Sequence, residues 1–203
     1  MSGRFITLEG GEGAGKSTQA RLLADALAAR GIPVLRTREP GGAPGAEILR
    51  GLLLDPAMDW SRRAETFLHF AARAEHVEKT IRPALAAGMW VICDRFTDST
   101  RAYQGFGLGV DRVLIESLAT QIGLDPDLTL VLDVSEETAR ARLATRGLPP
   151  DRYEAQAADF HTRIRAGFRA IAADHPSRCH LIDANGKLEQ VHAAILAAVD
   201  AGR

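Results

Sequence analysis

Residues 10–17 read Gly-Gly-Glu-Gly-Ala-Gly-Lys-Ser, which is the spacing of a phosphate-binding loop. Glycines allow backbone angles that are closed to other residues, so several N–H groups can converge on one anion. Lys16 adds a cation for the outer phosphates, and the Ser17 hydroxyl suits Mg²⁺, which prefers hard oxygen ligands. The residues expected to contact phosphate here are Gly10, Gly11, Glu12, Gly13, Ala14, Gly15, Lys16, Ser17 and Thr18.

Charged side chains also stand at the ends of three apolar runs. Glu9 ends the run before the loop, Arg38 follows the second run, and Asp94 and Arg95 follow the third. Glu9 or Asp94 could hold Mg²⁺, and Glu9 could instead meet a sugar hydroxyl or be a surface acid. Arginine binds phosphate oxygens bidentately, so two arginines favour an anionic acceptor over water. Either arginine could also be a solvated surface residue.

Two further groups of residues could contact a nucleotide. Phe70 and Arg73 are three apart on a predicted helix, so a ring and a guanidinium share one face and could stack on and hydrogen-bond a base. A core phenylalanine and a surface arginine fit this spacing equally well.

Arg146 and Arg152 flank a Gly- and Pro-rich stretch, which could close over transferring phosphates or form a solvated basic face.

Composition limits the classes of function. The net charge of the 203 residues is −1, which gives no basis for binding nucleic acid or an anionic membrane. The two cysteines, Cys93 and Cys179, lie far apart and predict buried, reduced thiols. No apolar stretch approaches the roughly 20 residues of a membrane span. We therefore expect a cytoplasmic protein.

Near-continuous apolar runs alternate with helical patterns, which is typical of parallel strands covered on both faces. The expected strands cover 4–9, 34–37, 89–93, 128–134 and 179–182. The expected helices cover 16–30, 44–54, 62–86, 111–122, 136–145, 153–174 and 187–200, whereas 98–107 is expected to be irregular or briefly helical. We predict one domain with a three-layer α/β/α P-loop kinase fold, a five-stranded parallel sheet and a small closing loop at 146–152. Its ligands should gather at the carboxyl ends of the strands.

Further short motifs accompany the phosphate loop. Residues 37–42 read Thr-Arg-Glu-Pro-Gly-Gly, 94–96 Asp-Arg-Phe, 102–105 Ala-Tyr-Gln-Gly, 126–129 Pro-Asp-Leu-Thr and 151–154 Asp-Arg-Tyr-Glu. This ordered set spans essentially the whole chain and resembles the thymidylate kinase family. The resemblance implies a homodimer that uses Mg²⁺ and transfers the γ-phosphoryl group of ATP to dTMP, giving dTDP for dTTP synthesis.

The resemblance also implies roles for single residues around the acceptor. Arg38 and Arg95 would hold the dTMP phosphate, Phe70 would stack on thymine and Arg73 would hydrogen-bond its edge. The implied acceptor site also includes Glu9, at the family's acidic strand-end position, Ser99 and Gln104, in the stretch that reads the base, and Tyr103, which crowds the sugar and disfavours a 2′-hydroxyl.

Glu12 within the phosphate loop is similar to the bacterial variant of the family, in which the closing loop supplies the catalytic arginine. Lys16, Arg95 and either Arg146 or Arg152 would then stabilise the transferring group. Other members place a basic residue in the phosphate loop instead. Phe96 stands where related sequences often carry Tyr or His, so no side-chain hydrogen bond is expected from this position.

Two other interpretations remain open on the residues alone. The chain could be a kinase for another nucleoside or nucleotide, which a panel of acceptors would reveal. It could also be a nucleotide switch or binding module without phosphoryl transfer. The sequence has no Asn-Lys-x-Asp motif for reading guanine, which argues against a switch of the GTPase type.

Overall fold

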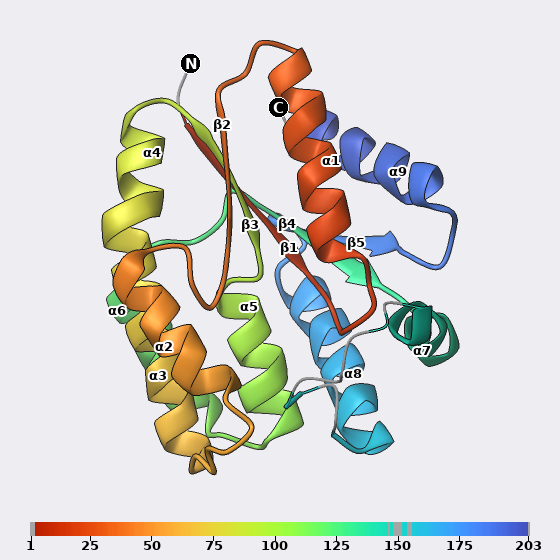
Figure 1. Cartoon of the computed structure of the whole chain (residues 1–203). Coiled ribbons are helices and arrows are strands. Elements are labelled where there is room, and N and C mark those ends of the chain that lie inside the picture. Colours follow the sequence, from red (N-terminus) through yellow and green to blue (C-terminus); the bar gives the residue numbers. More distant parts are fainter. Residues whose placement is uncertain (1–2, 146, 148–151, 154–155, 203) are drawn as a thin grey trace.

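The computed structural model of the chain contains a five-stranded parallel sheet between two layers of helices (Figure 1). It describes residues 3–145, 147, 152–153 and 156–202. Every strand pairing is parallel, and the order across the sheet is β2-β3-β1-β4-β5. The strands are β1 (Arg4–Glu9), β2 (Val34–Arg38), β3 (Trp90–Asp94), β4 (Leu128–Asp133) and β5 (Cys179–Asp183). The predicted sheet is therefore confirmed.

The helices lie close to the predicted ranges, and two predicted helix starts have a clear physical cause. Ser61 caps its helix as predicted, because its side chain accepts a hydrogen bond from the Ala64 N–H. Asp111 caps a later helix by accepting from Val113 N. The helical segments are α1 (Lys16–Ala29), α2 (Pro44–Leu54), α3 (Arg62–His76), η1 (Val77–Ile81), α4 (Arg82–Ala86), α5 (Thr97–Thr100), η2 (Arg101–Gly107), α6 (Arg112–Ile122), α7 (Glu136–Thr145), α8 (Ala158–Asp174) and α9 (Leu188–Ala201).

Three stretches differ in detail from the prediction. The long helix expected over 62–86 is continuous but includes the π-helical η1, which directly precedes the turn containing Pro83, a residue that cannot donate a backbone hydrogen bond. Residues 97–107 are helical throughout. Gly107 permits close packing there, since a Cβ would lie 2.6 Å from a ring carbon of Phe160. The helix expected from 153 begins at Ala158, and Tyr153 lies in a turn.

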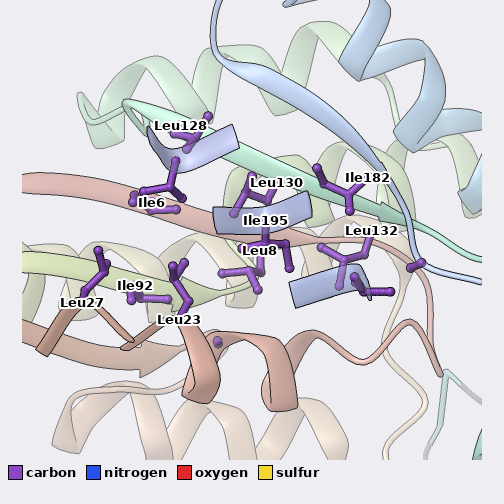
Figure 2. Close-up of a cluster of buried hydrophobic side chains, with 14 of the residues drawn as sticks. Ile6, Leu8, Leu23, Leu27, Ile92, Leu128, Leu130, Leu132, Ile182 and Ile195 are labelled. Carbon is purple, nitrogen blue, oxygen red and sulfur yellow. The ribbon is translucent and has the colours of Figure 1, made fainter. Parts of the chain in front are cut away.

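The hydrophobic core lies on both faces of the sheet. Ile6 and Leu8 of β1 point to the face covered by α1 and α9, where Leu23 and Ile195 contact them (Figure 2). The alternate residue Phe5 points to the opposite face, where residues of η1 and α4 form a second cluster. A third cluster joins η2 and α8 to β4. Burial on both faces explains why the strands read as nearly continuous apolar runs.

The sheet brings the charged strand ends to one edge. Glu9, Arg38, Asp94, Asp133 and Asp183 each end a strand, and the parallel register places them at the same side of the sheet. β1 lies in the centre, and the phosphate loop follows it at the point where the chain turns into α1 (Figure 1). A crevice at the carboxyl ends of central strands is the usual ligand site of such a sheet.

Two further predictions concern the closing loop and the absence of a membrane span. Much of the closing loop expected at 146–152, including Arg146, lies outside the described residues. Over the part of the chain that the structure does describe, we find no helix with both the length and the apolar character that crossing a bilayer requires.

Candidate active site

The phosphate loop has the backbone geometry that anion binding requires. Gly10 and Gly13 have φ values of 136° and 70°, and a Cβ on either would lie 2.5 or 2.6 Å from a carbonyl oxygen of Leu132 or Ala139. These positions therefore demand glycine. Helix α1 begins at Lys16, so its positive N-terminal end opens onto the loop.

The lysine and the hydroxyl of the loop both have defined partners. Lys16 is buried and its Nζ donates to Gly11 O at 2.7 Å, and both burial and the nearby Arg95 lower the pKa of the lysine. Ser17 Oγ donates to Asp94 Oδ2 at 2.5 Å, across from the end of β3. Ser17 and Asp94 thus form a pair of hard oxygen donors beside the loop. Ala14 is buried and Thr18 is exposed in the first turn of α1.

A cavity of about 240 Å³ opens beside the loop. Ten of the residues that the sequence analysis singled out line it, although they come from five separate segments of the chain. They are Glu12, Lys16, Ser17, Arg38, Arg73, Asp94, Arg95, Ser99, Tyr103 and Gln104. Glu9 and Phe70 are both buried, and neither is among the described residues that line the cavity.

Arg95 is the most tightly held cation of the cavity. Its Nη2 donates to Glu12 Oε1 at 2.5 Å and to the Tyr103 hydroxyl at 3.1 Å, and its Nη1 donates to Gly10 O and Ser99 Oγ, each at 3.2 Å. Its backbone adopts a φ of 73°, an unfavourable conformation for a residue other than glycine. The four contacts fix both the side chain and this strained backbone.

Glu12 is ionised beside Arg95 despite its burial. Burial opposes the charge, but Arg95 and Lys16 outweigh it and lower the pKa of Glu12 to about 2. The Tyr103 hydroxyl donates a further hydrogen bond to the same carboxylate oxygen at 2.8 Å. The phosphate loop therefore carries an anion that orients an arginine and a tyrosine of the cavity.

Glu9 is engaged by the protein rather than turned toward the cavity. Its exposed fraction is 0%, and its two oxygens accept from Phe96 N at 2.7 Å and Ser99 Oγ at 2.6 Å. Burial and the neighbouring Asp98 raise the pKa of Glu9 to about 8. In this arrangement Glu9 holds the start of α5 against the end of β1.

Arg73 reaches the cavity from α3 with one nitrogen unengaged. Its Nε donates to Glu39 Oε2 at 2.8 Å, its Nη2 donates to Thr100 Oγ1 at 3.1 Å, and its guanidinium lies 4.9 Å from the centre of the Phe70 ring. Its Nη1 is buried and has no hydrogen-bond partner among the residues that the structure describes. A buried donor of this kind fits a carbonyl oxygen of a ligand, which would satisfy it.

A second carboxylate, Glu65 of α3, is contacted by side chains from η2 and from residues 152–153. Gln104 Nε2, Tyr153 Oη and Arg152 Nη2 each lie 2.9 Å from an oxygen of Glu65. His69 Nε2 lies 2.9 Å from Tyr153 Oη, and burial lowers the pKa of this histidine to about 3, so the ring is neutral.

Sequence reasoning missed several residues of the site. Arg50 of α2 lines the cavity and carries no motif that could have identified it. Glu39 stood within the Thr-Arg-Glu-Pro-Gly-Gly motif, but its contact with Arg73 was not foreseen. Glu65 and His69 precede Arg73 at intervals of four, so ionisable residues repeat along the helix face that also carries Phe70. This repeat of ionisable residues is the sequence signal that could have identified Glu65 and His69 as residues of the site.

The fold and the site together define a class of protein. A phosphate-binding loop follows the central strand of a parallel sheet, and arginines at the carboxyl ends of β2 and β3 stand in the same cavity as the loop lysine. A donor phosphate chain and a second anionic group can therefore meet within one site. This arrangement is that of a P-loop nucleotide kinase.

Comparisons with known proteins specify the family. The family model for thymidylate kinase matches residues 8–195. The thymidylate kinase of Gluconobacter oxydans is 55% identical over 201 residues, covering 97% of this chain and 94% of that one. The thymidylate kinase of Chromohalobacter salexigens is 54% identical, covering 96% and 94%. A crystal structure of thymidylate kinase from Ehrlichia chaffeensis is 37% identical with a TM-score of 0.80, covering 98% and 99%.

The chain belongs to the thymidylate kinase family. Members of this family are ATP-dependent nucleoside monophosphate kinases that form dTDP from dTMP.

Replacing Glu9 by glutamine is expected to flatten the pH dependence of the free energy of unfolding. The pKa of Glu9 is about 8 in the folded chain against an ordinary value of 4.5. As the pH rises through this window the unfolded chain releases its proton first, so stability present at low pH is lost, by at most about 1.4 kcal/mol per pH unit. Chemical unfolding at several pH values measures the slope.

The matched control is Glu189→Gln, because Glu189 is exposed on α9. This variant should keep the wild-type slope. If Glu9→Gln also kept the wild-type slope, the pKa of Glu9 would not be raised in the folded chain.

Proposed function

We propose that this chain transfers the γ-phosphoryl group of ATP to dTMP, giving dTDP. The observation that carries the proposal is that Lys16 and Ser17 of the phosphate loop share one cavity with Arg38 and Arg95. The donor's phosphates on the loop and an acceptor phosphate on the arginines would then lie within reach of each other. Phosphoryl transfer requires mainly such positioning and the neutralisation of charge.

The acceptor side is assigned from the donors that the cavity presents. Arg38 and Arg95 hold the dTMP phosphate, and the unengaged Nη1 of Arg73 donates to a carbonyl oxygen of thymine. Phe70, whose ring lies against Arg73, is the ring on which we propose that thymine stacks. Tyr103 packs on Arg95, 4.8 Å from its guanidinium, and crowds the sugar where a 2′-hydroxyl would stand.

On the donor side, we propose that the ATP phosphates bind residues 10–18 with Mg²⁺ beside them. Ser17 and Asp94 fit this ion, because two protein oxygens and the phosphates suffice for Mg²⁺, which retains several waters. The ion would neutralise charge on the outer phosphates. Lys16 and Arg95 stabilise the transferring group from the protein side. Glu9 stays outside this proposal, because its oxygens accept from Phe96 and Ser99.

The stretch 146–152 is proposed to supply the catalytic arginine. Arg152 is anchored to Glu65 at 2.9 Å, which leaves the rest of its guanidinium for other contacts. Arg146 lies outside the described residues and shares this proposed role. Glu12 supports the assignment, since an anion in the loop calls for an additional cation from elsewhere when phosphates fill the site.

We further propose that the chain acts as a homodimer in the cytoplasm. Phe67 of α3 and Val113 of α6 are 43% and 76% exposed, and these two helices pack against each other. An apolar surface on neighbouring helices is suited to association with a second copy. We expect a solution mass of two chains by analytical ultracentrifugation. A single-chain mass at micromolar concentration would contradict this proposal.

The reaction itself is tested with a panel of acceptors. Purified protein with ATP and Mg²⁺ is expected to phosphorylate dTMP with a higher kcat/KM than dCMP or AMP, because the buried Nη1 of Arg73 can donate to the C4 carbonyl of thymine, whereas cytosine carries an amino group there and adenine has no carbonyl. Coupled detection of ADP measures the rates. Activity on dCMP or AMP with none on dTMP would favour a kinase for another acceptor, and nucleotide binding without transfer would favour a switch.

Lys16→Ala is expected to lower kcat by a factor of about 100 or more while the chain stays folded, because a cation aimed at the transferring phosphate is lost. Lys79→Ala is the control, since Lys79 is exposed on η1 and should leave the rate unchanged. Near-normal turnover in Lys16→Ala would remove the phosphate loop from the mechanism.

A further inference from the structure

One buried contact fixes the orientation of the Gln104 side chain. Gln104 is 1% exposed and lines the cavity, and its amide nitrogen donates to Glu65 Oε1 at 2.9 Å. The two residues come from different elements, η2 and α3, and are 39 positions apart. The contact is therefore a product of the tertiary fold and lies directly behind the cavity wall.

The chemistry of Glu65 allows only one orientation of this amide. An ionised carboxylate accepts hydrogen bonds and donates none, so it must face the NH₂ group of Gln104 and not its oxygen. Arg152 Nη2 forms an ion pair with Oε2 of Glu65 at 2.9 Å. The Tyr153 hydroxyl donates to Oε1. Three donors thus surround one acceptor, and a flipped amide would place two acceptors in contact.

The oxygen of Gln104 is consequently the atom left for a ligand. None of the hydrogen bonds among the described residues engages Gln104 Oε1. Arg73, which lines the same cavity, offers the buried donor Nη1. The cavity thus presents one fixed acceptor and one fixed donor. Both are set from behind by buried carboxylates, Glu65 for the glutamine and Glu39 for the arginine.

We infer that Glu65 is a specificity-determining positioning residue, which holds Gln104 as an acceptor and thereby selects pyrimidine bases with an N3–H beside a C4 carbonyl. The inference rests on the proposed function, in which the base lies against Arg73 and Gln104. Thymine and uracil carry this donor and acceptor pair. Cytosine carries the reverse, an unprotonated N3 beside an amino group, and would leave both protein groups without partners.

Glu65→Gln tests the inference with almost no change in shape. Arg152 can only donate, so the new side chain is expected to turn its oxygen toward Arg152 and its NH₂ toward Gln104. Gln104 must then flip and present its own NH₂ to the base. We expect the ratio of kcat/KM for dTMP over dCMP to fall about tenfold or more, from a loss with dTMP and a gain with dCMP.

Two comparison variants separate orientation from general damage. Glu78→Gln makes the same change at an exposed position on η1 and should leave rates and ratio at the wild-type values. Tyr153→Phe removes another donor to Glu65 and the longer 3.4 Å contact between Gln104 Nε2 and the Tyr153 hydroxyl, but it keeps the hydrogen bond from Gln104 to Glu65. Its ratio is expected to stay at the wild-type value whatever happens to kcat. Dissociation constants for dTMP and dCMP, measured by calorimetry, provide the same ratio without turnover.

The possible outcomes are distinct. A wild-type ratio in a folded Glu65→Gln variant would overturn the inference while leaving the kinase assignment intact. A wild-type protein that does not phosphorylate dTMP would overturn the proposed function itself. Should Glu65→Gln fail to fold, Glu65→Asp keeps the charge but withdraws the carboxylate from Gln104. A fall in the ratio would again support the inference, and an unchanged ratio would refute it.

Discussion

The central constraint on the structure is the electrostatic repulsion among several cations that line one small cavity. Among the described residues, one lysine and four arginines line it, namely Lys16, Arg38, Arg50, Arg73 and Arg95. Their mutual repulsion, strengthened by burial, would disfavour the folded chain unless anions lay among them. Carboxylates supply that balance from inside the protein, which is why a chain with a net charge of only −1 can concentrate positive charge at one edge of its sheet.

The same carboxylates determine where the cations point. Glu12 orients Arg95, Glu39 orients Arg73 and Glu65 anchors Arg152. A buried ion pair adds little net stability, but losing one partner is costly, so these pairs act as strict geometric constraints. Arg95 illustrates the strength of the constraint, because its backbone is held at a φ of 73°. Donors fixed in advance need little reorganisation when charge develops on a transferring phosphate.

The sequence predicted the fold and the parts of the site that depend on local pattern. Apolar runs punctuated by Gly and Pro located the strands, and parallel pairing then placed Arg38 and Asp94 at one edge. The sequence did not predict the buried acid partners, because Glu65 and Gln104 are 39 positions apart and meet only in the tertiary fold. The stretch 98–107 was hard to classify for a related reason. Gly107 signals a turn in the sequence, but in the fold it makes room for Phe160.

The charge balance of the cavity also bears on how substrates bind in it. An acceptor phosphate that approaches Arg95 meets Glu12 as well, since the two side chains lie 2.5 Å apart. Two anions would then share one guanidinium, and the donor phosphates on the adjacent loop would increase the repulsion. A further cation is needed at that moment, and the loop cannot supply it with a glutamate at position 12. The arginines of 146–152 follow α7 directly in sequence, and α7 packs against the loop through Ala139. We therefore propose that the glutamate that orients Arg95 makes catalysis depend on an arginine from outside the phosphate loop.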